Sequence, residues 1–173
     1  MLGAAIKALA SETASVMMSL MPKLDLDAIP ATNATDYPVP FDSEVAGRWY
    51  RRLSPASGLS DFGASHVVLK PGAWSSQRHW HNGEDEFVVM IAGEAVLVED
   101  EGEVIVSAGD CVAFPKGTTN GHHLINRSDE DCIFVVIGGG QPTGGGYADI
   151  DMLFTADDRY TSKEGIDYER KRR

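Results

Sequence analysis

Three histidine positions and one glutamate form the pattern with the clearest chemical meaning in this chain. His79 and His81 lie one residue apart, Glu86 follows shortly after them, and a His122-His123 pair comes about forty residues further on. Side chains alternate along a β-strand, so His79 and His81 project from one face if their segment is a strand. Imidazole nitrogens and a carboxylate oxygen suit a divalent first-row transition metal. The spacing therefore predicts a metal site within β-structure.

The chain between the histidines and the glutamate contains two further acidic groups. A short turn at residues 82–85 is expected to return the chain antiparallel beside the histidine strand. Glu86 then begins an apolar run, where its carboxylate can face inward at the margin of a strand. Glu84 and Asp85 are assigned to the solvated turn. His122 and His123 cannot both face inward from one strand, and alternation alone leaves the choice between them open.

The elements that must position these side chains are predicted to be short β-strands. Gly, Pro, Asn and Asp separate them at short intervals, which is typical of a β-sandwich or barrel. The predicted strands are Val45–Leu53, Phe62–Lys70, Trp74–His81, Glu86–Ile91, Glu94–Glu99, Glu103–Ser107, Cys111–Phe114, Gly121–Asn126 and Cys132–Ile137.

The segments outside these strands divide the chain into three parts. Residues 1–43 comprise a mildly apolar start, predicted to be a short helix or disordered, and a proline-rich extended arm from Lys23 to Ser43. Residues 44–138 form the predicted barrel. Residues 139–173 comprise a glycine-rich flexible loop and an irregular tail, in which Tyr147–Tyr168 is expected to wrap the barrel or to reach a second subunit.

Charge and hydropathy exclude several classes of partner. The 173 residues carry a formal net charge of −11, whereas nucleic acids and anionic membranes need a basic surface. The basic cluster Arg170–Arg173 is interpreted as a solvated end. The sequence has no stretch that resembles a signal peptide or a transmembrane span. We therefore expect a cytoplasmic protein that binds neither nucleic acid nor membrane.

Two segments resemble the sequence motifs of the cupin superfamily: Gly72–Gly93, which contains His79, His81 and Glu86, and Gly109–Asn126, which contains Pro115, Gly117 and His122. The resemblance implies an all-β double-stranded β-helix, a jelly-roll-like barrel, with one metal ion bound by His79, His81, Glu86 and His122. Both motifs depart from the usual spacing: the gap before His79 is one residue longer, and the gap before His122 is two residues longer. The position of Asn126 favours His122 over His123 as the fourth ligand.

The implied site sets the range of expected functions. Three imidazoles and one carboxylate suit Fe, Mn, Ni, Co or Zn and leave coordination positions open for a ligand. We expect a metalloenzyme with dioxygenase- or isomerase-like chemistry on a small polar metabolite, or alternatively a non-catalytic ligand-binding or sensor protein. Gln77 shares the histidine face and is the candidate for substrate contact. Catalytic residues beyond the ligands are not assigned, and the resemblance implies a homodimer.

Overall fold

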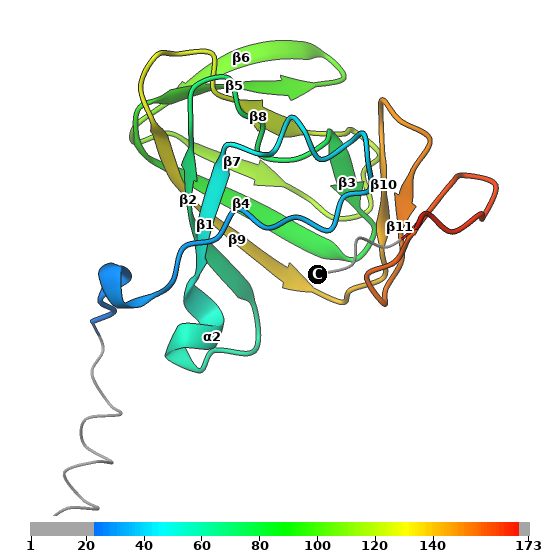
Figure 1. Cartoon of the computed structure of the whole chain (residues 1–173), viewed down its shortest axis with the longest axis horizontal. Coiled ribbons are helices and arrows are strands. Elements are labelled where there is room, and N and C mark those ends of the chain that lie inside the picture. The colour runs from blue at the N-terminus through cyan, green and yellow to red at the C-terminus, as the bar shows by residue number, and fades with distance from the viewer. Residues whose placement is uncertain (1–22, 170–173) are drawn as a thin grey trace, which may run out of the picture.

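Five antiparallel strands form the larger layer of residues 23–169, the part of the chain that the computed structural model describes (Figure 1). On β4, Val88 and Met90 are buried whereas Phe87 and Ile91 are exposed, as the alternation of strand side chains requires. One face of the sheet therefore meets the core. The strands, in sheet order, are β1 (Arg48–Arg52), β2 (Gly63–Leu69), β9 (Cys132–Gly140), β4 (Glu84–Ala92) and β7 (Cys111–Phe114).

Two smaller antiparallel sheets contain the remaining strands. One has the order β6 (Gly102–Ser107), β5 (Glu94–Glu99) and β8 (His123–Ile125). The other has the order β12 (Tyr160–Thr161), β11 (Leu153–Phe154), β10 (Gly145–Tyr147) and β3 (His79–His81).

The hydrophobic core joins the larger sheet to the β6-β5-β8 sheet. Val88 and Phe134 of the larger sheet pack in one cluster with Leu97 of β5 and Leu124 of β8. The fold is thus the expected all-β, jelly-roll-like barrel, and the two layers enclose the side chains that alternate inward.

The arm and the tail meet in a second apolar cluster. The arm begins with a short 3-10 helix, η1 (Leu26–Ala28), and its Tyr37 packs with Tyr147 and Met152 of the tail. The rings of Tyr37 and Tyr147 contact edge to face, with centroids 5.7 Å apart. The tail also pairs with the histidine strand through β10, so it packs against its own chain, which is one of the two arrangements expected from the sequence. The prediction for residues 1–22 concerns a segment outside the described residues.

The glycine-rich segment differs from its prediction. It is not a flexible loop throughout: β9 continues to Gly140, and Gly145 and Gly146 belong to β10. A Cβ on Gly145 would overlap the carbonyl oxygen of Trp80 and the ring of Phe154. Glycine is present here because the neighbouring strands approach closely, and composition alone does not distinguish that role from flexibility.

The histidine strand is shorter than predicted and pairs differently. Only His79–His81 is extended within the predicted Trp74–His81 strand, and it pairs with β10 rather than with β4. Glu84 and Asp85 lie in β4 and not in a solvated turn. The turn before β4 thus carries the chain from one sheet to another, so the histidines and Glu86 face each other from different sheets.

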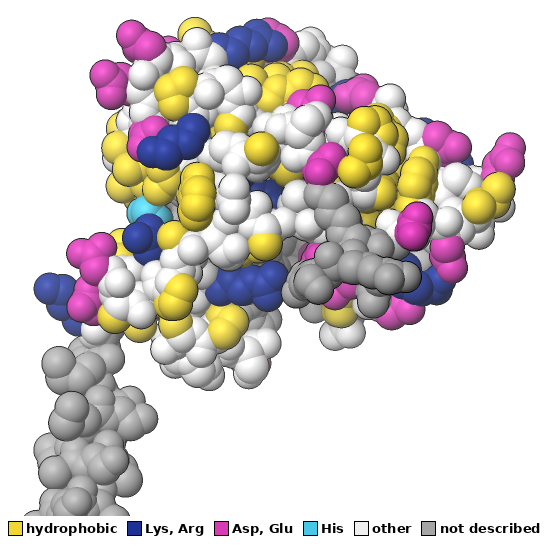
Figure 2. All heavy atoms as spheres, viewed as in Figure 1, with side chains coloured by type: hydrophobic (Ala, Val, Ile, Leu, Met, Phe, Trp, Pro, Cys, Tyr) yellow, Lys and Arg dark blue, Asp and Glu magenta, His cyan; other side chains and the backbone are white. Residues whose placement is uncertain are grey.

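A short α-helix follows the edge strand of the larger sheet. Helix α2 (Leu53–Ser57) begins where the sequence predicted the end of a strand, and it stops at Gly58, whose φ of 72° is the left-handed geometry of a helix C-cap. Within residues 23–169 no helix has the length and apolar character needed to cross a bilayer. Acidic and basic side chains are interspersed on the face seen in Figure 2.

Candidate metal centre

His79 and His81 direct their rings to one place from β3. Their Nε2 atoms lie 3.1 Å apart and their ring centroids 4.9 Å apart. The pairing of β3 with β10 places His79 opposite Tyr147 and His81 opposite Gly145. Two imidazole nitrogens that face each other at this distance need a shared proton or a shared cation between them.

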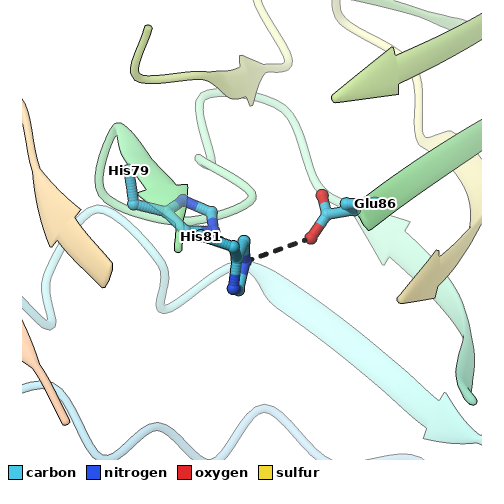
Figure 3. Close-up of side chains that lie close together, drawn as sticks. All are labelled: His79, His81 and Glu86. Atoms are coloured by element: carbon cyan, nitrogen blue, oxygen red, sulfur yellow. Dashed lines mark hydrogen bonds and ion pairs between the residues drawn. The ribbon is translucent and has the colours of Figure 1, made fainter. Parts of the chain in front are cut away.

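Glu86 approaches the histidine pair from β4, in the larger sheet (Figure 3). Its Oε2 lies 3.6 Å from Nε2 of His81. One ligand atom from each of His79, His81 and Glu86 lies within 4.8 Å of the other two, a spacing that a single metal ion can bridge. The structure thus brings three of the four predicted ligands together.

His122 reaches the same place from the chain just before β8. Its backbone exchanges two hydrogen bonds with His79, of 2.9 Å and 3.2 Å. Its ring stacks on Phe114 with centroids 3.6 Å apart, and its Nε2 lies 3.6 Å from Oε1 of Glu86. That Nε2 is buried and has no hydrogen-bond partner. An unsatisfied buried nitrogen is costly, and a metal ion would satisfy it.

His123 lines the same cavity but makes different contacts. Its Nδ1 lies 3.0 Å from the carbonyl oxygen of Ser76, and its ring packs edge to face against Trp74. Leu124, which shares the parity of His122, belongs to the barrel core. The alternation along this segment therefore separates the two histidines, with His122 beside Glu86 and His123 against Trp74.

The ring orientation of His79 is set by its own loop. Nδ1 lies 3.0 Å from the carbonyl oxygen of Gln77 and 3.2 Å from Oγ of Ser76. A carbonyl oxygen can only accept, so Nδ1 carries the proton and donates it, and the lone pair is on Nε2. A backbone partner on the far nitrogen is the arrangement that orients histidine ligands of metals.

Burial and neighbouring charges determine the protonation of the group. Burial, with smaller contributions from the neighbouring rings, lowers the pKa of His79 to about 3, so this ring is neutral. Burial acts to raise the pKa of Glu86, but the His122 and His81 rings outweigh it and hold the pKa well below its usual range. Burial acts to lower the pKa of His81, but Glu86 and Glu84 outweigh it and raise the pKa. A neutral imidazole beside an ionised carboxylate is the state that binds metal.

Gln77 lies away from the face on which the sequence placed it. Its side chain is buried, and Nε2 donates hydrogen bonds of 3.0 Å to the carbonyl oxygen of Phe41 and 3.3 Å to Oε2 of Glu44. The irregular backbone before β3 breaks the alternation from which its position was predicted. Its contacts in the structure anchor the arm to the loop that carries His79.

A cavity of about 560 Å³ extends from the four side chains into the barrel. Its walls include Tyr37 from the arm and three side chains of β1, Arg48, Tyr50 and Arg52. The motifs in the sequence did not indicate these four residues. In the predicted Val45–Leu53 strand, Arg48, Tyr50 and Arg52 occupy every second position. This alternation is the signal that could have indicated that the three side chains share one face.

Comparisons with known proteins identify the family. Residues 65–138 match the family model named Cupin domain. The crystal structure of a cupin-superfamily sugar phosphate isomerase from Silicibacter pomeroyi has 43% sequence identity to this chain and a TM-score of 0.81, over 86% of this chain and 97% of that chain. None of the curated proteins matches the chain. The protein belongs to the cupin superfamily.

More distant solved structures share the barrel. The plu4264 protein from Photorhabdus luminescens is 27% identical, with a TM-score of 0.52 over 70% of this chain and 88% of that chain. A Cupin 2 conserved barrel domain protein from Salinispora arenicola is 25% identical, with a TM-score of 0.50 over 69% of this chain and 87% of that chain. The likeness therefore extends over most of each of these shorter barrels.

Proposed function

We propose that this cupin is a metal-dependent isomerase of a phosphorylated sugar. The observation that carries the proposal is the convergence of His79, His81, Glu86 and His122 at one end of a cavity large enough for a small metabolite. The 43% identical protein from Silicibacter pomeroyi, a sugar phosphate isomerase, supports the substrate class and the reaction.

The four side chains fit a divalent metal ion. Facing Nε2 atoms on His79 and His81, an ionised Glu86 and an unpartnered Nε2 on His122 supply three nitrogen donors and one oxygen donor. This donor set suits Fe, Mn, Ni, Co or Zn. When bound, such an ion would supply Lewis-acid polarisation of the oxygen atoms of a ligand.

Tyr37 on the arm is a hydrogen-bond donor in the wall of the same cavity. It lines the cavity, and burial raises the pKa of its phenol. The hydroxyl is therefore protonated at neutral pH and can donate a hydrogen bond to a substrate oxygen. Aldose–ketose isomerisation moves one proton between two carbons and one between two oxygens, so it needs proton donors and acceptors but no oxidant.

The direct test measures metal and turnover on the same preparations. Purified protein is expected to contain, or to take up on titration, about one divalent ion per chain, and His79→Ala is expected to lose it. Isomerisation is followed by NMR as exchange of the substrate's carbon-bound proton in deuterated buffer, over a panel of sugar phosphates. A metal-loaded protein that exchanges no such proton would contradict the isomerase.

Two outcomes would favour the other functions expected from the sequence. Oxygen consumption with an added metabolite would indicate a dioxygenase, and tight binding of a sugar phosphate without turnover would indicate a binding or sensor protein. The homodimer and the cytoplasmic location remain predictions, as does the division into residues 1–43, 44–138 and 139–173. Size-exclusion chromatography with light scattering tests the homodimer.

A further inference from the structure

The inward face of β1 carries two arginines into the cavity that contains the metal centre. Arg48, Tyr50 and Arg52 alternate along the strand, and all three line the cavity. Trp49 and Arg51 occupy the intervening positions and therefore project from the opposite face. A strand in the wall of the barrel thus presents two permanent positive charges to the ligand space.

The guanidinium of Arg48 is held in place, but one of its N–H groups has no hydrogen-bond acceptor. Its Nη1 donates a 2.7 Å hydrogen bond to the carbonyl oxygen of Ser75, and its guanidinium lies 5.5 Å from the ring centroid of Tyr50. Its Nε is buried and has no hydrogen-bond partner. A buried guanidinium N–H without an acceptor is expensive, and an anionic ligand oxygen would supply that acceptor.

Arg52 continues the same surface toward solvent. Its guanidinium lies 5.9 Å from the Tyr50 centroid, so the tyrosine ring orients both arginines. In the β1–β2 register Arg52 lies opposite Ser65, which also lines the cavity. The two arginines and this serine offer the donor groups from which phosphate sites are built.

Formal charges of both signs line the cavity. Two guanidinium groups lie there, whereas the acidic residues that line the cavity are Asp36 on the arm and Glu86 at the metal centre. Over the whole cavity the two carboxylates equal the two guanidinium groups in number, so the positive charge offered to an anion is that of Arg48 and Arg52 on β1 itself.

We propose that Arg48 and Arg52 bind the phosphate group of the substrate while its sugar end occupies the metal centre. This inference rests on the proposed function, because it assigns the phosphate of the same ligand. Arg48 contacts Ser75, and Ser76 in turn contacts His79. We call Arg48 and Arg52 the arginine end of the cavity, and the four metal ligands its metal end. Both ends contact the loop at residues 75–79, which fixes the distance between the two parts of one ligand.

The test separates the arginine end from the metal end by titrating inorganic phosphate into four variants. Arg48→Met and Arg52→Met are each expected to weaken phosphate binding at least about tenfold, because a charge-assisted hydrogen bond is lost. Both are expected to keep the metal content of the wild type. Arg51→Met removes the same charge from the other face of β1 and is expected to leave phosphate binding unchanged.

The fourth variant excludes phosphate binding to the metal itself. Glu86→Gln is expected to lose metal and to retain phosphate binding within about threefold. Arg52 is exposed, so Arg52→Met is expected to fold even if Arg48→Met does not. Wild-type affinity for phosphate in both arginine variants would overturn the inference, as would the absence of phosphate binding by the wild type.

A second readout distinguishes failure of this inference from failure of the proposed function. If the protein isomerises a sugar phosphate, the arginine variants are expected to raise KM at least about tenfold with a smaller change in kcat. Unchanged KM in an active enzyme would overturn the arginine assignment alone. Arginine-dependent phosphate binding by a protein that isomerises nothing would overturn the proposed isomerase and leave the phosphate site standing.

Discussion

The two ends of the cavity are built in different ways. The metal end draws His79, Glu86 and His122 from separate segments, and the opposing faces of two sheets bring them together. The arginine end takes Arg48 and Arg52 from alternate positions of one strand. A site assembled across sheets depends on the whole barrel, whereas a site along one strand depends mainly on local alternation. Substitutions at the two ends are therefore expected to differ in how far their effects spread.

The largest expected effect is a loss of metal affinity that leaves the arginine end unchanged. Glu86→Gln removes the ionised oxygen donor and is expected to lower metal affinity more than about 100-fold, beyond the loss typical of a residue that merely supports a ligand. Inductively coupled plasma mass spectrometry and zinc titration measure it. Glu84→Gln is the matched control, because Oε2 of Glu84 lies 3.6 Å from the outer nitrogen of His81. Equal losses in both variants would contradict the assignment of Glu86.

A second comparison concerns metal affinity after substitution of each of the neighbouring histidines, His122 and His123. His122→Ala is expected to lower metal affinity at least about 100-fold, more than the loss typical of a residue that merely supports a ligand, since it removes the donor whose Nε2 has no other partner. His123→Ala is expected to retain metal, because that ring contacts Ser76 and Trp74. Titration of both variants decides between them. Loss of metal only in His123→Ala would reverse the choice of fourth ligand.

Backbone crowding beside the histidine strand offers a way to disturb the metal end without touching a ligand. Gly145→Ala is expected to cost about 1–3 kcal/mol in the free energy of unfolding, because its Cβ would overlap Trp80, and to weaken metal binding through β3. Urea unfolding measures the first effect and zinc titration the second. Gly138→Ala is the control, since its Cβ would meet its nearest neighbour at 3.9 Å. Phosphate binding at β1 is expected to change less than metal binding.

Acid is expected to weaken the metal end but not the charge of the arginines. Glu86 and Glu84 raise the pKa of His81, so below that pKa the metal-free protein holds a proton that a metal ion must displace. Metal affinity should therefore fall by about tenfold per pH unit as pH decreases through this range and level off above it. His79, with a pKa of about 3, adds no such dependence near neutrality. Glu84→Gln should shift the profile to lower pH in the same zinc titrations.

The smallest expected effect concerns the loop that both ends share. Gln77→Met removes the hydrogen bonds to Phe41 and Glu44 and is expected to cost about 1 kcal/mol of stability, with metal and phosphate affinity close to the wild type. Thermal unfolding and the two titrations measure this. A large rise in KM with unchanged stability would instead support the prediction from the sequence that Gln77 contacts the substrate.

Local pattern predicted most of the strands and the ligand types but not their spatial relations. Cys111–Phe114 and Glu94–Glu99 were predicted with the bounds that the structure has, because turn residues enclose each run. The predicted Trp74–His81 strand was wrong over residues 74–78, where the side chains of Ser75 and Ser76 make hydrogen bonds within an irregular segment. That error also misplaced Gln77, whose position was inferred from alternation.

The sequence by itself determined the donor atoms, the alternation that puts His79 and His81 on one face, and the short-strand pattern of the barrel. Only the tertiary structure decided that Glu86 meets them from another sheet, and that Arg48 opens into the same cavity. The physical reason is that alternation acts over neighbouring residues, whereas the pairing of β3 with β10 and of β4 with β9 depends on contacts between segments distant in the chain.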